Sequence, residues 1–141
     1  MRRFLSPALL VLVSLAISPR SAHAQREETI SDKAMTLVKF STLEYPKRAA
    51  QALVQGIVVV RAKLDDSGGV VSATAVFGDE LLIPASLDNA KQWRFKPNTE
   101  KAVVIVYDFR VNEAVSKPGC SNFLVEPPNF ATITMCAPGI Q

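Results

Sequence analysis

Histidine is almost absent from this sequence of 141 residues, in which the only example is His23. Cysteine is also scarce, with Cys120 and Cys136 alone. Activation of a serine or cysteine nucleophile commonly depends on a histidine, and so do many zinc sites. If the segment that holds His23 is removed, the remaining chain has no imidazole. We then expect neither a catalytic triad nor a histidine-ligated zinc ion.

The first 24 residues have the pattern of a secretory signal peptide. Arg2 and Arg3 give a positively charged start, residues 4–17 form an apolar run, and small residues precede a cleavage site after Ala24. The apolar run is shorter than the roughly 20 residues that a membrane-spanning helix needs. We therefore expect cleavage after Ala24 and export of a soluble chain to the periplasm. A retained signal that anchors the chain in the membrane is the alternative.

The charge balance argues against a nucleic-acid partner. The sequence has 16 Lys and Arg residues and 13 Asp and Glu residues. Arg2, Arg3 and Arg20 lie in the predicted signal, so the chain that follows it carries 13 residues of each sign. Such a chain has no basic surplus to bind phosphate groups.

The two cysteines flank a predicted hairpin near the C-terminus. Residues 123–125 and 130–135 are rich in strand-forming side chains, and Pro127, Pro128 and Asn129 separate them. A hairpin with this turn places Cys120 opposite Cys136, and an oxidising compartment favours their pairing. We predict a Cys120–Cys136 disulfide that closes the hairpin.

Polar and apolar patterns between residues 25 and 77 predict a lead-in, a helix and three strands. Residues 25–34 are polar and predict a flexible lead-in, and residues 35–40 favour a short strand. Pro46 fits the start of a helix over residues 47–54. Apolar side chains alternate in residues 56–64 and 70–77, as in half-buried strands joined by a tight turn.

A second helix and a further strand complete the predicted domain. Pro84 fits a helix start, and Pro97 ends the helical pattern. Residues 102–111 alternate again. We predict an α+β fold, with a small three-stranded antiparallel sheet, two helices packed on one face, and a C-terminal disulfide-closed hairpin extension. The expected divisions are signal 1–24, lead-in 25–34, domain 35–111 and extension 112–141.

The predicted domain resembles the TonB C-terminal domain family. The resemblance covers roughly residues 35–111, and its most specific part is Trp93-Arg94-Phe95-Lys96-Pro97. The motif positions that we expect to be structural are Tyr45, Pro46, Gly56, Gly68, Gly78, Trp93, Phe95 and Pro97. The family's fold, two helices against a three-stranded antiparallel sheet, agrees with the one predicted from periodicity.

The resemblance implies protein binding rather than catalysis. TonB-like proteins connect an inner-membrane proton-driven complex to outer-membrane transporters, and their C-terminal domain adds an extended transporter segment to its sheet edge. We therefore expect a non-enzymatic interaction module with an envelope protein as partner, such as an outer-membrane transporter, and with no cofactor or metal. By resemblance, the binding edge comprises Val103, Val104, Ile105, Val106, Tyr107, Asp108 and Phe109.

Two features distinguish the chain from a full energy transducer. Its predicted signal is cleavable, and the lead-in is too short to cross the envelope. Residues 112–141 lie outside the resemblance and either cover or extend the strand edge. The alternatives are a short membrane-anchored transducer with an uncleaved signal, and a small histidine-free periplasmic enzyme that uses only lysine and carboxylates such as Asp65 and Asp66.

Overall fold

The structure is a computed structural model that describes residues 37–112 and 121–137. The predicted signal, the lead-in and Cys120 lie outside these residues. The elements, in chain order, are β1 (Leu37–Lys39), α1 (Lys47–Gln51), β2 (Gly56–Leu64), β3 (Val70–Phe77), α2 (Ile83–Ala90), β4 (Arg94–Phe95), β5 (Ala102–Asn112), β6 (Asn122–Glu126) and β7 (Phe130–Cys136).

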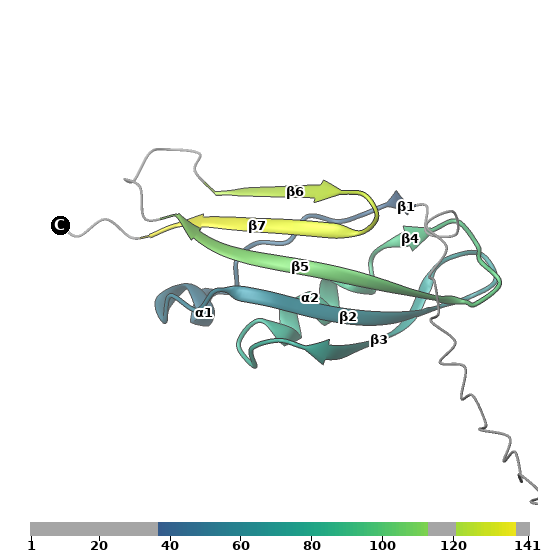
Figure 1. Ribbon diagram of the computed structural model, residues 1–141, viewed down its shortest axis with the longest axis horizontal. Helices are drawn as coiled ribbons and strands as arrows, with labels where there is room; N and C mark the ends of the chain where they lie inside the picture. The colour runs from purple at the N-terminus through teal and green to yellow at the C-terminus, as the bar shows by residue number, and fades with distance from the viewer. Residues whose placement is uncertain (1–36, 113–120, 138–141) are drawn as a thin grey trace, which may run out of the picture.

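Five strands form one mixed sheet in the order β3-β2-β5-β7-β6 (Figure 1). β2 pairs antiparallel with both β3 and β5, and β6 pairs antiparallel with β7. β5 and β7 are parallel, with Val106 opposite Phe130 and Asn112 opposite Cys136. β1 and β4 form a separate antiparallel pair.

The predicted fold class is wrong in its sheet. We expected three antiparallel strands and a separate disulfide-closed hairpin, but both hairpin strands belong to a five-stranded mixed sheet. The cause is the parallel pairing of β7 with β5, which joins the C-terminal residues to the domain that precedes them. Cys136 ends β7, whereas its predicted disulfide partner lies outside the described residues.

One face of the sheet carries the core. Val58, Val60 and Ala62 of β2 are fully buried, as their alternation predicts, and the inward side chains of β5 and β7 continue this layer. Trp93, from the residues after α2, is also fully buried. α2 packs against β2 and β3 and lies behind the sheet in Figure 1. Burial of this face holds the strands and α2 together.

Candidate functional site

The strand predicted to be the binding edge lies inside the sheet. β5 has β2 on one side and, from Val106 onward, β7 on the other. The prediction that residues 103–109 form a sheet edge is therefore wrong for Val106–Phe109, which β7 covers. Strand addition at Val106–Phe109 would require displacement of β7, because both sides of the main chain there are already paired.

Side chains of the predicted edge are mostly core residues. Val103, Ile105, Tyr107 and Phe109 are at most 2% exposed. Burial raises the pKa of the Tyr107 phenol, whose hydroxyl donates to Asn89 Oδ1 at 3.1 Å. These inward side chains stabilise the fold and are not accessible to a partner.

Asp108 points to the opposite face from these core side chains and is ion-paired. The guanidinium of Arg110 contacts its Oδ2 from Nε at 2.7 Å. That carboxylate raises the pKa of Arg110 by hydrogen bonding and by its charge. Asp108 is 9% exposed, so it offers little surface to a ligand.

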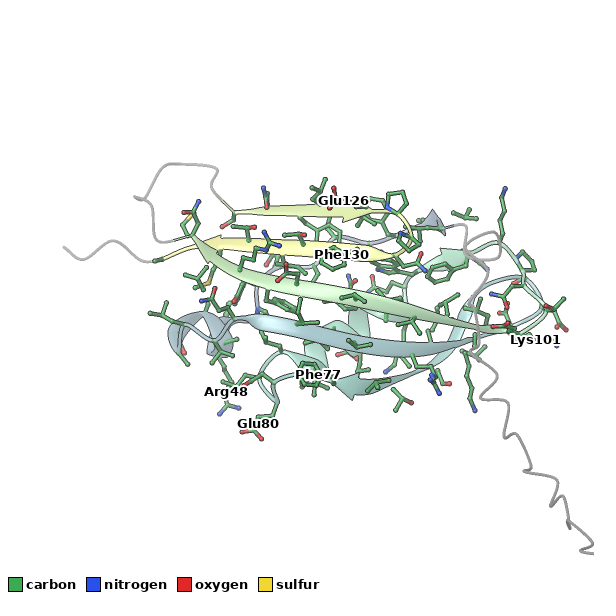
Figure 2. All side chains as sticks on the ribbon, in the orientation of Figure 1. Arg48, Phe77, Glu80, Lys101, Glu126 and Phe130 are labelled. Atoms are coloured by element: carbon green, nitrogen blue, oxygen red, sulfur yellow. The ribbon has the colours of Figure 1, made fainter. Side chains whose placement is uncertain are left out.

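The outer strands of the described sheet are β3 and β6, at its two opposite edges (Figure 2, where Phe77 lies on β3 and Glu126 on β6). β3 shifts register twice against β2, which leaves Val71 and Val76 as extra residues. Such bulges disrupt an edge and discourage the addition of another strand. β6 pairs with β7 in an unbroken register and contains no Lys, Pro or bulge. β6 is therefore the more receptive edge.

The hydrogen-bond pattern shows which groups of β6 face outward. Val106 donates its N–H to Asn129 O, and Ala137 donates its N–H to Asn112 O, both at 3.0 Å. Odd-numbered residues of β7 thus direct their main-chain groups to β5, and even-numbered residues direct theirs to β6. Since the even residues of β6 lie opposite even residues of β7, the N–H and C=O groups of Phe123 and Val125 point to the outer edge.

Apolar side chains flank this edge on both faces. Leu124, on the face away from the helices, is 53% exposed. On the helix side Phe40 is 44% exposed, and its ring centroid lies 5.9 Å from that of Phe123. Exposed apolar groups beside polar ones are typical of protein-interaction sites.

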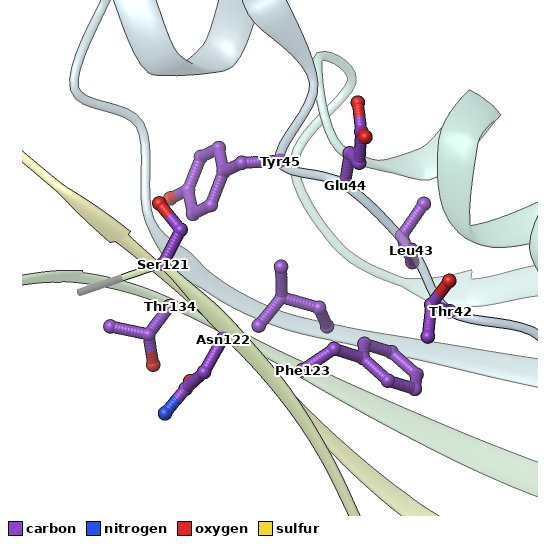
Figure 3. Close-up of a pocket in the computed structure, with 9 residues that line it drawn as sticks. Thr42, Leu43, Glu44, Tyr45, Ser121, Asn122, Phe123 and Thr134 are labelled. Atoms are coloured by element: carbon purple, nitrogen blue, oxygen red, sulfur yellow. The ribbon is translucent and has the colours of Figure 1, made fainter. Parts of the chain in front are cut away.

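A pocket of about 500 Å³ adjoins β6 on the helix side. One wall is the chain from Thr42 to Tyr45 (Figure 3). The other wall is formed by Ser121, which precedes β6, by Asn122 and Phe123 of β6, and by Ile133 and Thr134 of β7. Leu43, Phe123 and Ile133 supply apolar surface, whereas most other lining side chains are polar. The pocket resembles ligand sites in this mixture of an apolar lining and a few polar groups.

Asn89 of α2 holds one wall of the pocket in place. Its Nδ2 donates to the main-chain oxygens of Ser41 and Thr42 at 3.0 and 3.1 Å. Its Oδ1 accepts from Trp93 Nε1 at 2.8 Å, in addition to the Tyr107 hydroxyl. A residue that is 3% exposed thus connects α2, β5 and the pocket wall. Sequence reasoning missed this role because a polar residue on a helix gives no sign of its distant partners.

Tyr45 anchors the other end of that wall. Its hydroxyl donates to Val54 O at 2.5 Å, and its ring packs edge-on against Phe109 with centroids 5.4 Å apart. Burial raises the pKa of Tyr45, and the negative charge of Asp108 raises it further. Pro46 follows directly as the N-cap of α1.

The remaining motif residues have structural positions. Gly68 has φ +84°, and a Cβ there would lie 1.8 Å from the carbonyl oxygen of Phe95. At Gly78 a Cβ would lie 2.8 Å from Val58 Cγ2. Gly56 has φ +141°, and Pro97 lies beside Gly68. All three glycines have a positive φ that side chains rarely adopt, and at Gly68 and Gly78 a Cβ would also collide with a neighbour.

Asp65 and Asp66 hold a turn rather than a reaction site. Asp65 Oδ1 accepts hydrogen bonds from Ser67 N, Ser67 Oγ and Gly69 N at 2.7–2.9 Å. These bonds lower the pKa of Asp65. Asp66 forms an exposed ion pair with Lys101. Within residues 37–112 and 121–137, no group of three or more His, Cys, Asp or Glu side chains is placed to bind a metal.

Comparison with protein families identifies the core of this arrangement. The model of the Gram-negative bacterial TonB protein C-terminal family matches residues 41–112, about half of the chain. The chain belongs to the TonB C-terminal family. A comparison with curated proteins found no match. Family membership supports a TonB-like protein-interaction module of the cell envelope.

The TonB match ends at Asn112, the last residue of β5. β6 and β7 therefore lie beyond the matched residues, although they belong to the same sheet. In the described part of the chain, no helix is both long enough and apolar enough to cross a bilayer. The C-terminal hairpin of this TonB-like chain covers, from Val106 onward, the strand that the family resemblance named as the edge, and it presents β6 as an outer strand.

Proposed function

We propose that this chain is an exported, periplasmic module that binds an extended segment of another envelope protein by adding it to the outer edge of β6. An outer-membrane transporter is the partner class that the family suggests. The observation that carries the proposal is the position of the hairpin, because β7 covers β5 and leaves β6 as an outer strand. Main-chain groups of Phe123 and Val125 would pair with the bound segment.

Displacement of β7 is an unfavourable route to binding. Its inward residues Ala131, Ile133 and Met135 are 0%, 1% and 6% exposed. Removing a buried Ile or Met side chain from the core costs about 1.5–3 kcal/mol each, before any loss of strand pairing. A partner at β5 would have to offset this cost, whereas a partner at β6 would not.

Export is part of the proposal. The predicted signal, with cleavage after Ala24, would deliver the chain to the compartment where envelope partners present extended segments. Mass analysis of the chain from a periplasmic fraction tests this step. We expect a chain that begins at Gln25, and a full-length chain in the membrane fraction would support the anchored alternative instead.

Site-specific photo-crosslinking tests the proposed edge. A photo-reactive amino acid replaces Leu124 of β6 or, as the matched control, Val71 of β3, which is similarly exposed. We expect cross-links to a segment of an envelope protein from position 124 and few from position 71. Cross-links from position 71 alone would place the partner at β3 and contradict the proposal.

Proline substitution tests whether the partner segment pairs with the main chain of β6. Val125→Pro removes an outward N–H, and proline is tolerated on an edge where the N–H faces solvent. Ala73→Pro is the matched change on β3. Leu64 of β2 donates its N–H to Lys101 O, on the β5 side, so even residues of β2 face β5; Ala73, opposite the even residue Ala62, therefore directs its N–H outward. With folding checked by circular dichroism, we expect only Val125→Pro to abolish the cross-link from position 124.

A further inference from the structure

The pocket beside β6 points to a preference for particular segments. Resting on the proposed edge binding, we infer that this pocket selects a segment that places an apolar side chain beside Phe123 and carries a cationic side chain close to it. The occupant is thus a partner segment of stated chemistry. The inference concerns specificity, which main-chain pairing alone does not supply.

Strand geometry brings one guest side chain to the pocket. The main-chain groups of Phe123 face the outer edge, so a guest residue can pair directly with it. Side chains of directly opposed residues lie on the same face of a sheet, with Cβ atoms about 5 Å apart. The guest side chain opposite Phe123 therefore stands on the helix side, where Phe123 lines the pocket.

The lining of the pocket favours an apolar guest. Leu43, Phe123 and Ile133 present apolar surface, and Phe40 adds an exposed ring next to Phe123. A guest side chain placed there would leave water for apolar contacts, as would part of the Phe40 ring. The volume of about 500 Å³ leaves space for a large aliphatic or aromatic side chain.

Glu44 gives the pocket its charge. Among the lining residues that the structure describes, it alone has a charged side chain, and it is exposed. Within the described residues its carboxylate forms no salt bridge. A Lys or Arg near the apolar guest residue would complement this carboxylate, and an acidic residue there would be repelled.

Peptide selection tests the inference without a known partner. The probe is a library of random-sequence peptides displayed on phage and selected on protein produced from the full-length chain. Enriched sequences are then synthesised, and their affinity is measured by fluorescence anisotropy. We expect the enriched peptides to share one apolar position with a basic residue nearby, and replacement of that apolar residue by Ser to weaken binding about tenfold or more.

Variants of the protein identify where the peptides bind. Thr42→Trp fills the pocket from an exposed position whose main-chain oxygen stays bonded to Asn89, and Thr74→Trp is the matched change on β3. We expect a loss of about tenfold or more for Thr42→Trp and none for Thr74→Trp. Glu44→Gln should weaken binding of basic peptides by about two- to fivefold.

Other outcomes contradict the inference in distinguishable ways. In one outcome, Val125→Pro abolishes peptide binding, but neither Thr42→Trp nor loss of the peptide's apolar residue affects it. Such peptides bind the edge alone, which overturns the role of the pocket in selection and leaves edge binding in place. Peptides that respond to Thr42→Trp but not to Val125→Pro use the pocket without the edge, which overturns the link between them. Absence of enriched peptides, with a dimer that Val125→Pro dissociates, assigns the edge to a second copy and overturns both proposals.

Discussion

Two halves of the sheet, β2–β3 and β6–β7, are covered differently on the face that carries the core. α2 lies over β2 and β3, where inward side chains such as Val58 and Val60 are fully buried. β6 and the adjoining part of β7 are covered by the extended chain around Thr42–Tyr45, and a pocket remains between the two layers. The outer strands differ as well, since β3 carries two bulges and β6 none. This difference indicates that the β2–β3 half of the sheet serves stability and that the β6–β7 half is suited to binding.

Trp93→Ala should have the largest effect on stability, because Trp93 follows α2 and its ring also contacts the extended chain that covers the β6–β7 half. Its ring contacts Phe40 of the extended chain and Tyr107 of β5, with centroid distances of 6.1 and 5.9 Å. We expect the free energy of unfolding to fall by about 3–5 kcal/mol. Urea unfolding measures this loss. A loss below about 1 kcal/mol would show that α2 and the extended chain do not pack into one shared core.

Asn89→Ala tests how the two halves are joined, because Asn89 of α2 holds the extended chain by hydrogen bonds to Ser41 and Thr42. The change leaves Trp93 Nε1 and two main-chain oxygens without their present partner. We expect a loss of about 2–4 kcal/mol and faster amide exchange around Thr42. Ser86→Ala is the control, because Ser86 is buried on the same helix but bonds only to Leu82 O among described residues. Equal losses for both variants would argue against a bridging role.

Asp65→Ala tests the turn that joins β2 and β3 on the stable side. Because the pKa of Asp65 is lowered in the folded chain, its ionised form contributes stability above the unfolded-state pKa. That contribution is lost as pH falls through the lowered pKa of the folded state. We expect wild type and variant to differ in unfolding free energy at neutral pH and to converge in acid. A difference that does not change with pH would assign the effect to the turn's shape alone.

Leu124→Lys should have the smallest effect on stability and a selective effect on binding. Leu124 is exposed, so we expect the unfolding free energy to stay within about 0.5 kcal/mol of wild type. An edge lysine opposes strand addition, so peptide binding at β6 should weaken. Val71→Lys on β3 is the matched control and should leave binding unchanged. Equal weakening by both variants would remove the functional distinction between the two edges.

Local patterns in the sequence predict most elements of this fold, although α1 ends at Gln51 and the strand β4 (Arg94–Phe95) was not predicted. The alternation in residues 56–64 and 70–77 corresponds to β2 and β3, and Pro84 lies at the start of α2. The hairpin around Pro127–Asn129 is also present as β6 and β7. These features depend on side-chain periodicity and turn chemistry, which a short stretch of sequence contains.

Pairing between distant strands could not be predicted in the same way. Nothing in the alternation of β5 indicates that β7 lies beside it, because a strand buried between two neighbours and an edge strand can share one pattern. The predicted edge at Val106–Phe109 was wrong for this reason. The pocket was missed because its walls come from residues 42–45 and 121–134, which are far apart in the sequence.

Amide hydrogen exchange with a bound peptide tests the central claim most directly. The N–H groups of Phe123 and Val125 face the outer edge, whereas that of Val106 bonds to Asn129 of the β6–β7 turn. If a segment adds to β6, exchange at Phe123 and Val125 should slow in the complex and exchange at Val106 should stay unchanged. Unchanged exchange at Phe123 and Val125, with faster exchange throughout β7, would show that the partner displaces the hairpin and would contradict the account.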